Sequence, residues 1–118
     1  MVTPIFRIFD YQKALDFYVD WLGFRVDWEE RTNNGPFYLQ VSRGDLVLHL
    51  SGHHNDSCPG SKAMAEMKGL RAYHHLLMQR DYPFMRPELG KATWSDKVMQ
   101  SEVIDPFGNR IVFVEACL

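Results

Sequence analysis

Apolar residues follow two periodicities in the first half of the chain, and the changes between them indicate where helices and strands begin and end. Residues 11–22 carry apolar side chains at helical spacing, which predicts one helix. Asp10 stands before it as an N-cap, and Gly23 follows where a helix commonly ends. The expected strands are residues 2–9, 24–30, 36–42 and 46–51, with turns at 32–35 and 43–45.

The second half of the chain repeats this order: an offset of 59 positions places the first strand on 62–68 and the first helix on 70–80, although few residues are identical across the offset. We expect a strand over 61–67, a helix over 70–80, an irregular stretch with a short strand over 82–94, and strands over 97–104 and 110–116 joined by a turn at 105–109. Each half is therefore predicted to be a β-α-β-β-β module.

The two faces of the predicted strands differ in composition. The three leucines of residues 46–51 fall on one face, and Val47, His49 and Ser51 fall on the other. The leucine face suits a core under the helix, whereas the His49 face is mixed, as the wall of a cavity would be. The last strand, 110–116, is apolar on both faces. Its second face is expected to line a cleft or to pack against another copy of the chain.

The length and composition favour one compact α+β domain. The chain has 118 residues, of which 46% are hydrophobic and 14% aromatic, enough for a substantial core. Two strand-rich modules, with one helix over each sheet, predict an α+β fold. Module one is expected to span about 1–53 and module two about 61–118.

Charge and cysteine content limit the partners and the compartment. The net charge of −2 argues against nucleic acid as a partner, because binding phosphates needs a basic surface. No apolar run approaches the ~20 residues of a membrane helix, and we expect no membrane partner. Cys58 and Cys117 are expected to be free thiols in a reducing compartment, since the chain shows no signal segment. The expected location is the cytoplasm.

Several motifs together resemble one family. They are DYQKALDFYVDWLGF at 10–24, RGDLVLHLS at 43–51 followed by a His-rich loop and CPG, Trp94 before the penultimate strand, and DPFGNRIVFVE at 105–115. In this order and at these distances they resemble the glyoxalase, bleomycin-resistance and extradiol-dioxygenase (vicinal oxygen chelate) superfamily, and its bleomycin-resistance branch in particular. The resemblance implies paired βαβββ modules whose curved mixed sheets form a cup, and an intertwined homodimer.

The resemblance also implies four positions at which enzymes of the superfamily hold a divalent metal. In this sequence they fall on Thr3, His49, Lys62 and Val112. Only His49 is a plausible ligand, because Lys62 is cationic, Val112 has no donor atom and Thr3 is a poor donor. A catalytic metal usually needs about three protein ligands. We therefore expect no metal, no cofactor and no catalytic residue.

Five residues are candidates for binding a ligand: Trp28, Phe37, His49, Trp94 and Glu102. The aromatic rings suit a planar ligand by stacking, and they attract a cation over the ring face. Glu102 adds negative charge, together with Asp27, Glu29, Glu30 and Asp56. The competing interpretation is that the rings are core or dimer contacts and the carboxylates are solvated surface charges.

Three functional hypotheses follow. The first is a metal-independent homodimer that sequesters a planar, cationic antibiotic of the bleomycin type in clefts at the dimer interface, without chemistry. The alternative is a divalent-metal-dependent lyase, isomerase or dioxygenase of the same superfamily. The third is a relative whose small ligand is unrelated to any antibiotic.

Overall fold

The computed structural model of the chain describes residues 1–31 and 35–117. These residues form two compact units, each with its own four-stranded sheet. The first unit comprises residues 1–61 and 105–109, and the second comprises 62–104 and the residues from 110 onward. The turn expected at 32–35 lies outside the described residues except for Gly35.

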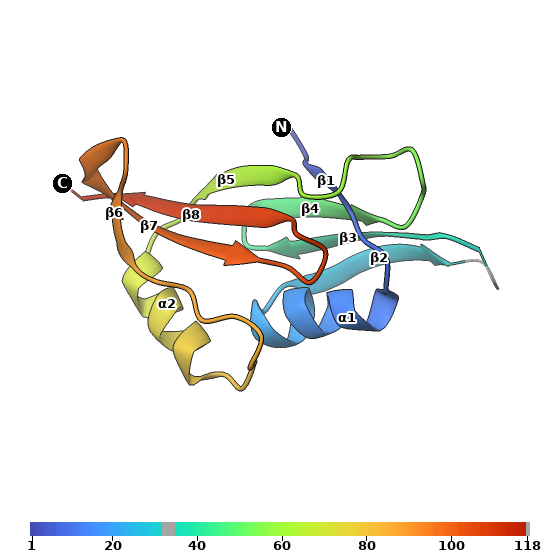
Figure 1. Cartoon of the computed structure of the whole chain (residues 1–118), viewed down its shortest axis with the longest axis horizontal. Coiled ribbons are helices and arrows are strands. Elements are labelled where there is room, and N and C mark those ends of the chain that lie inside the picture. The colour runs from blue at the N-terminus through green and yellow to red at the C-terminus, as the bar shows by residue number, and fades with distance from the viewer. Residues whose placement is uncertain (32–34, 118) are drawn as a thin grey trace. The chain divides into compact units, whose positions relative to one another are not determined.

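The first unit has one helical segment over a mixed sheet. Its elements are β1 (Ile5–Arg7), α1 (Tyr11–Leu15), η1 (Asp16–Trp21), β2 (Arg25–Arg31), β3 (Phe37–Arg43) and β4 (Leu46–Ser51). The strand order is β1-β4-β3-β2, in which β1 runs parallel to β4 and the other pairs are antiparallel. The helical segment lies along one face of this sheet (Figure 1). The first strand is shorter than the expected 2–9, and Val2 is 94% exposed.

The predicted helix begins as expected and then widens. The Asp10 side chain caps α1 by accepting a hydrogen bond from the Lys13 N–H. From Asp16 the helix is a π-helix, in which the Leu22 N–H bonds to the Phe17 carbonyl oxygen at 2.9 Å. The large apolar side chains of this turn are all buried against the sheet: Phe17, Tyr18, Trp21 and Leu22. The wider turn directs both adjacent pairs, Phe17–Tyr18 and Trp21–Leu22, toward the core. Gly23 ends the segment with φ of 82°.

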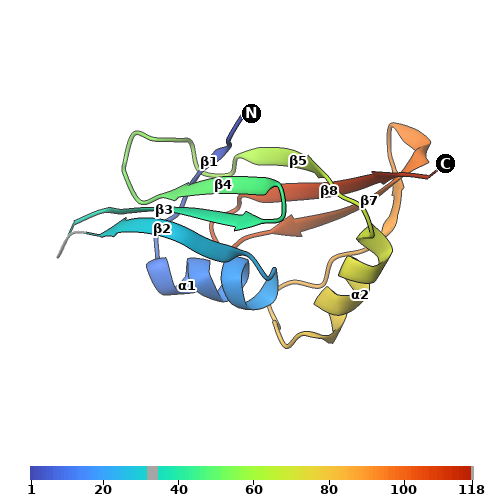
Figure 2. The ribbon, with the colours of Figure 1, turned by 180° about the vertical axis from the view of Figure 1, so that it is seen from behind.

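The second unit repeats the topology of the first. Its elements are β5 (Lys62–Glu66), α2 (Leu70–Gln79), β6 (Gly90–Ala92), β7 (Ser95–Ile104) and β8 (Arg110–Ala116). The strand order β5-β8-β7-β6, with β5 parallel to β8, matches that of the first unit position for position. Figure 2 shows β5 beside β8, with α2 following β5. The repeated module pattern and the α+β fold are therefore confirmed.

Strand β8 is buried on both faces, as its sequence indicates. Phe113 contacts the Tyr73 ring of α2 edge-on at 5.3 Å between centroids, which places Ile111 on the same side. Val112 lies on the opposite side and is also buried. Its register partners there are Met64 of β5 and Glu102 of β7. This side of the second sheet is therefore lined by valines between longer side chains.

A carboxylate from β8 caps α2. The Glu115 side chain accepts hydrogen bonds from the Gly69 N–H at 2.8 Å and from the Leu70 N–H at 3.0 Å. Both N–H groups belong to the first turn of the helix, where they lack partners within the helix. The hydrogen bonds from Leu70 and Gly69 lower the pKa of Glu115, because they favour the ionised form.

Replacement of Glu115 by Gln is expected to lower the melting temperature at pH 7 and to have less effect in acid. A depressed pKa in the folded state contributes stability above the unfolded pKa, and this is lost as the pH falls through the folded value. Thermal denaturation of both proteins between pH 3 and pH 7 measures the effect. A difference in melting temperature that does not change with pH would contradict this assignment.

The turn at 105–109 belongs to the first unit although it joins two strands of the second. Asn109 donates from Nδ2 to the Arg7 carbonyl oxygen at 2.8 Å, and its Oδ1 accepts from the Ser61 N–H at 3.2 Å. Asp105 is 4% exposed and accepts a hydrogen bond from the Tyr18 hydroxyl at 2.7 Å. The turn is thus held by side chains that reach residues far away in the sequence.

Two further expectations concern cysteines and membranes. Cys58 and Cys117 are both exposed and unbridged, so the prediction of free thiols is confirmed. Within residues 1–31 and 35–117, no helix has the length and apolar character needed to cross a membrane.

Candidate functional site

The face of the first sheet away from α1 carries the best candidate site. On β3 and β4 the buried side chains Leu39, Val41, Leu48 and Leu50 point toward the helix. Strand alternation therefore places Tyr38, Gln40 and His49 on the opposite face. Trp28, Gln40, His49 and Ile5 are successive register partners, so they form one row across all four strands. We call the side chains of Asp27, Trp28, Tyr38, Gln40 and His49 the open face.

Three rings form a compact aromatic group on the open face. Trp28 stacks on Tyr38 with centroids 5.9 Å apart and planes inclined by 10°. The His49 ring meets both edge-on, at 5.3 Å from Trp28 and 5.2 Å from Tyr38. Trp28 is 42% exposed. Such a group offers a partly exposed surface on which a planar ligand can stack.

A β-bulge places Trp28 in this group. Val26 pairs with Val41, and the next register pair on β2 is Trp28 with Gln40, so Asp27 is an extra residue. A bulge moves the following residues to the other face of the strand. The strand expected over 24–30 is present, but the bulge interrupts its regular alternation. Asp27 and Trp28 both contribute side chains to the open face.

A chain of hydrogen bonds connects the polar groups of the open face. The Tyr38 hydroxyl lies 2.7 Å from His49 Nδ1, and His49 Nε2 lies 3.0 Å from Gln40 Oε1. Gln40 Nε2 donates to Asp27 Oδ2 at 3.0 Å. Arg25 donates to the other Asp27 oxygen at 2.9 Å. Both ring nitrogens of His49 are thus bonded to protein groups.

Hydrogen bonds and burial shift two pKa values here. The hydrogen bond from Gln40 is the main cause that lowers the pKa of Asp27, followed by one from Ser42. Asp27 is therefore ionised at neutral pH. Burial raises the pKa of the Tyr38 hydroxyl, and the negative charge of Asp56 raises it further. Tyr38 keeps its proton at neutral pH. The open face accordingly carries a carboxylate beside the uncharged rings of Tyr38 and Trp28.

The structure brings together two of the five predicted ligand-binding residues, Trp28 and His49. Phe37 lies on the other face of the first sheet, where its ring contacts Tyr11 at 5.7 Å between centroids. The cause is strand alternation, since Phe37 is one residue before Tyr38 on β3. Phe37 is therefore not part of the open face, and a ligand that stacks there would not meet its ring.

Trp94 and Glu102 belong to the second unit. Trp94 lies in the turn between β6 and β7 and is 60% exposed. Glu102 of β7 lies between two cations, with one carboxylate oxygen 3.2 Å from Lys62 Nζ and the other 3.7 Å from Arg110. Its negative charge is therefore partly neutralised within the unit.

Sequence reasoning missed Tyr38 and Gln40 as site residues. The sequence did contain a signal for them. The two-residue turn between β3 and β4 sets the pairing of these strands, which places Gln40 opposite His49 and Tyr38 diagonally beside it. Asp27 was considered only as a source of negative charge.

The residues present do not fit the metal site of the superfamily's enzymes. His49 has both ring nitrogens bonded to Tyr38 and Gln40. Lys62 is paired with Glu102, and Val112 is a buried apolar side chain. Among residues 1–31 and 35–117, no three His, Cys, Asp or Glu side chains lie together in a way that would hold a metal ion. These side chains therefore do not form the donor set that a catalytic metal needs.

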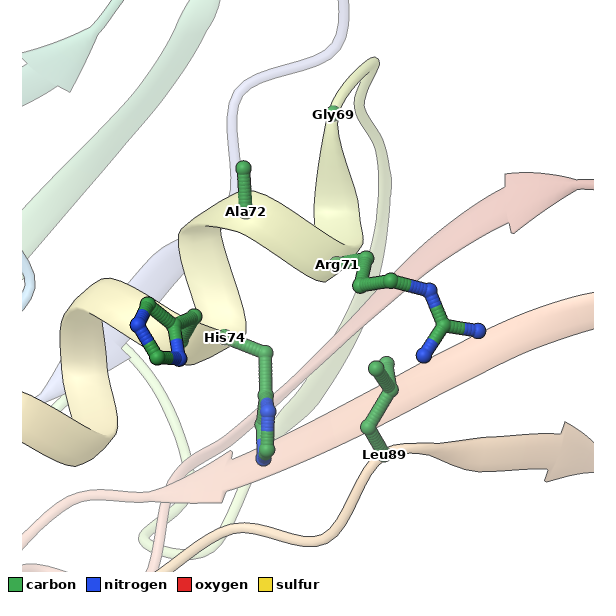
Figure 3. A pocket seen from close by; sticks show the side chains of 6 residues that line it. Gly69, Arg71, Ala72, His74 and Leu89 are labelled. Atoms are coloured by element: carbon green, nitrogen blue, oxygen red, sulfur yellow. The ribbon is translucent and has the colours of Figure 1, made fainter.

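The second unit contains an open hollow of about 900 Å³ beside α2. It is lined by Gly69, Arg71, Ala72, His74, His75 and Leu89. Figure 3 shows Arg71 on α2 and Leu89 on the segment before β6 approaching one another across it. His74 donates from Nε2 to the Pro87 carbonyl oxygen at 2.8 Å, which occupies that nitrogen. His74 and His75 have different partners, as expected for adjacent residues on a helix.

Comparison with known proteins agrees with the fold. The sequence model of a family described as "Glyoxalase superfamily protein" matches residues 1–117. No curated protein matches the sequence.

Solved structures of two antibiotic-binding proteins and of a bleomycin resistance determinant resemble this chain. A bleomycin-binding protein from Streptomyces verticillus, complexed with copper(II)-bleomycin, is 27% identical with a TM-score of 0.70, and the match covers 95% of this chain and 92% of the other. An antibiotic binding protein from Streptomyces sp. CB03234 is 22% identical with a TM-score of 0.69, covering 98% and 96%. A bleomycin resistance determinant encoded on the transposon Tn5 is 17% identical with a TM-score of 0.73, covering 100% and 98%.

Proposed function

Because the chain belongs to the glyoxalase superfamily, we propose that it is a metal-independent binding protein that sequesters a planar antibiotic of the bleomycin type. The observation that carries this proposal is the aromatic group of Trp28, Tyr38 and His49 on the open face. Its rings suit stacking, and the nearby Asp27 carboxylate suits a cationic ligand. Sequestration needs shape, stacking and charge, and it needs no catalytic group.

The 27% identical protein from Streptomyces verticillus supports the choice of ligand, since it was solved with copper(II)-bleomycin. The metal in that complex is part of the named ligand. The position of His49 supports metal independence, because both its nitrogens already bond to protein groups. This arrangement argues against the alternative of a metal-dependent lyase, isomerase or dioxygenase.

We further propose that the protein is a homodimer and that the open face forms one wall of a cleft at the dimer interface. A ligand that stacks on the partly exposed Trp28 is expected to bind more tightly when a second wall covers its other side. In this proposal the second copy supplies that wall, and Trp94 and Glu102 are candidate ligand contacts on it.

Titration of the purified protein with metal-free bleomycin tests the proposal. Tryptophan fluorescence should change and saturate at micromolar ligand, because one of the three tryptophans lies on the open face. Sedimentation analysis should give the mass of a dimer. The titration should saturate at two ligands per dimer. Elemental analysis should find well under one divalent ion per chain. No binding at ~100 μM bleomycin would reject the ligand, and one tightly bound ion per chain would reject metal independence.

Replacement of Trp94 by Ala is expected to weaken bleomycin binding while leaving the melting temperature within about 2 °C of the original. An exposed side chain in a turn has few core contacts to lose. Calorimetric titration and thermal denaturation of the same sample separate the two effects. A large drop in melting temperature would instead assign Trp94 a structural role.

A further inference from the structure

The orientation of the Gln40 amide follows from its partner. An ionised carboxylate can only accept hydrogen bonds, so the group that lies 3.0 Å from Asp27 Oδ2 must be the NH₂ of Gln40. The amide oxygen of Gln40 then points to His49 Nε2 at 3.0 Å. Asp27 therefore determines which end of Gln40 meets the histidine.

The state of His49 follows from the orientation of Gln40. An amide oxygen only accepts, so His49 Nε2 must carry the proton and donate it to Gln40. In the neutral imidazole Nδ1 then has no proton and accepts from the Tyr38 hydroxyl at 2.7 Å. The chain of donors thus runs in one direction, from Tyr38 through His49 and Gln40 to Asp27.

This direction has a consequence for Tyr38. Its only proton is directed to His49, so its oxygen can act toward a ligand only as an acceptor. The Asp27 carboxylate is likewise an acceptor.

We propose that Asp27, through Gln40, fixes His49 as the Nε2–H tautomer, so that Tyr38 offers the ligand an acceptor and the open face selects planar ligands that carry N–H donors. The part that concerns the ligand rests on the proposed function. The part that concerns the tautomer rests only on the hydrogen bonds of the first unit. Asp27 and Gln40 are positioning residues in this scheme, and Tyr38 contacts the ligand.

Nitrogen-15 NMR at pH 7.5 tests the tautomer without any ligand. The protein has five histidines, and a His49→Gln variant assigns the His49 signals. We expect Nε2 to be protonated and Nδ1 to be unprotonated. In an Asp27→Asn variant the new amide can meet either end of Gln40, and the two tautomers should become mixed. A protonated Nδ1 in the original protein, or an Asp27→Asn spectrum that is unchanged, would overturn the proposal.

Two acridine dyes test the ligand selection. Proflavine and acridine orange are both planar cations with the same ring N–H, but the amino groups of acridine orange are fully methylated, so the two dyes differ in their amino N–H donors. We expect the original protein to bind proflavine about fivefold more tightly, the effect of one hydrogen bond. A Tyr38→Phe variant retains the ring that stacks on Trp28 and should lose this preference.

The outcomes of the two experiments are distinguishable. An equal affinity for both dyes, or a preference that persists in Tyr38→Phe, would overturn the selection by N–H donors. Failure of both dyes to bind would overturn the selection and count against the proposed function, whereas the tautomer would still be decided by NMR.

Discussion

Replacement of Asp105 by Ala is expected to destabilise the protein by about 3 kcal/mol, as measured by chemical denaturation at pH 7. The Asp105 carboxylate accepts four hydrogen bonds. Their donors are the Tyr18 hydroxyl at 2.7 Å, the Phe107 N–H at 2.9 Å, the Asn109 N–H at 2.8 Å and Asn109 Nδ2 at 2.9 Å. Without the carboxylate these donors lose their partner in a buried site, and unsatisfied buried donors are costly.

The loss of stability caused by Asp105→Ala should also depend on pH. Burial raises the pKa of Asp105, and the hydrogen bonds from Asn109 and Tyr18 only partly oppose this effect. A raised folded pKa means that the stability contributed by this group is largest below the unfolded pKa and is reduced as the pH rises through the folded value. The difference in free energy of unfolding between the original protein and the Asp105→Ala variant should therefore become smaller from pH 4 to pH 7.

An exposed carboxylate of the second unit serves as the control. Asp96 lies near the start of β7 and is exposed, so Asp96→Ala should change the free energy of unfolding by less than about 0.5 kcal/mol. A loss below about 1 kcal/mol for Asp105→Ala would show that water replaces the carboxylate at the turn.

Replacement of Trp28 by Ala is expected to weaken bleomycin binding by about 100-fold, which is about 2.7 kcal/mol. Trp28 has the largest ring of the open face. It stacks on Tyr38 and contacts His49 edge-on. Its removal takes away the stacking surface and one side of the aromatic group. Since Trp28 is 42% exposed, the melting temperature should change little by comparison.

Calorimetric titration is the suitable measurement, because the substitution itself alters the fluorescence. A Trp28→Phe variant is the matched control, since it keeps a ring at this position and should lose less than tenfold in affinity. If Trp28→Ala binds bleomycin as tightly as the original protein, the ligand binds elsewhere and the open face is not the site.

The order of helices and strands could be predicted from the sequence because local signals agree with the fold. Asp10 and Gly23 bound the first helix as expected, and the three leucines of β4 indicate the face that packs against it. The first strand and helix recur at an offset of 59 positions, and the strands that follow come in the same order, which predicted the second sheet. At these positions strong periodicity and turn residues were sufficient to predict the helices and strands.

The site was harder to predict because it depends on register. The bulge at Asp27 reverses the side on which Trp28 lies, and neither Val26 nor Trp28 signals such a bulge in sequence. Phe37 and Tyr38 are neighbours with similar rings, yet only one faces His49. A shift of one residue exchanges the two faces of a strand, so the identity of the residues alone could not decide between them.

The turn at 105–109 limits how the chain can be divided. The first unit is completed by Asp105 and Asn109, which come from late in the sequence and bond to Tyr18, Arg7 and Ser61. A fragment cut after residue 61 would lack these groups, even though it contains an entire sheet and its helix. The two modules share a topology, but the first module is complete only with a turn that follows β7 in the sequence.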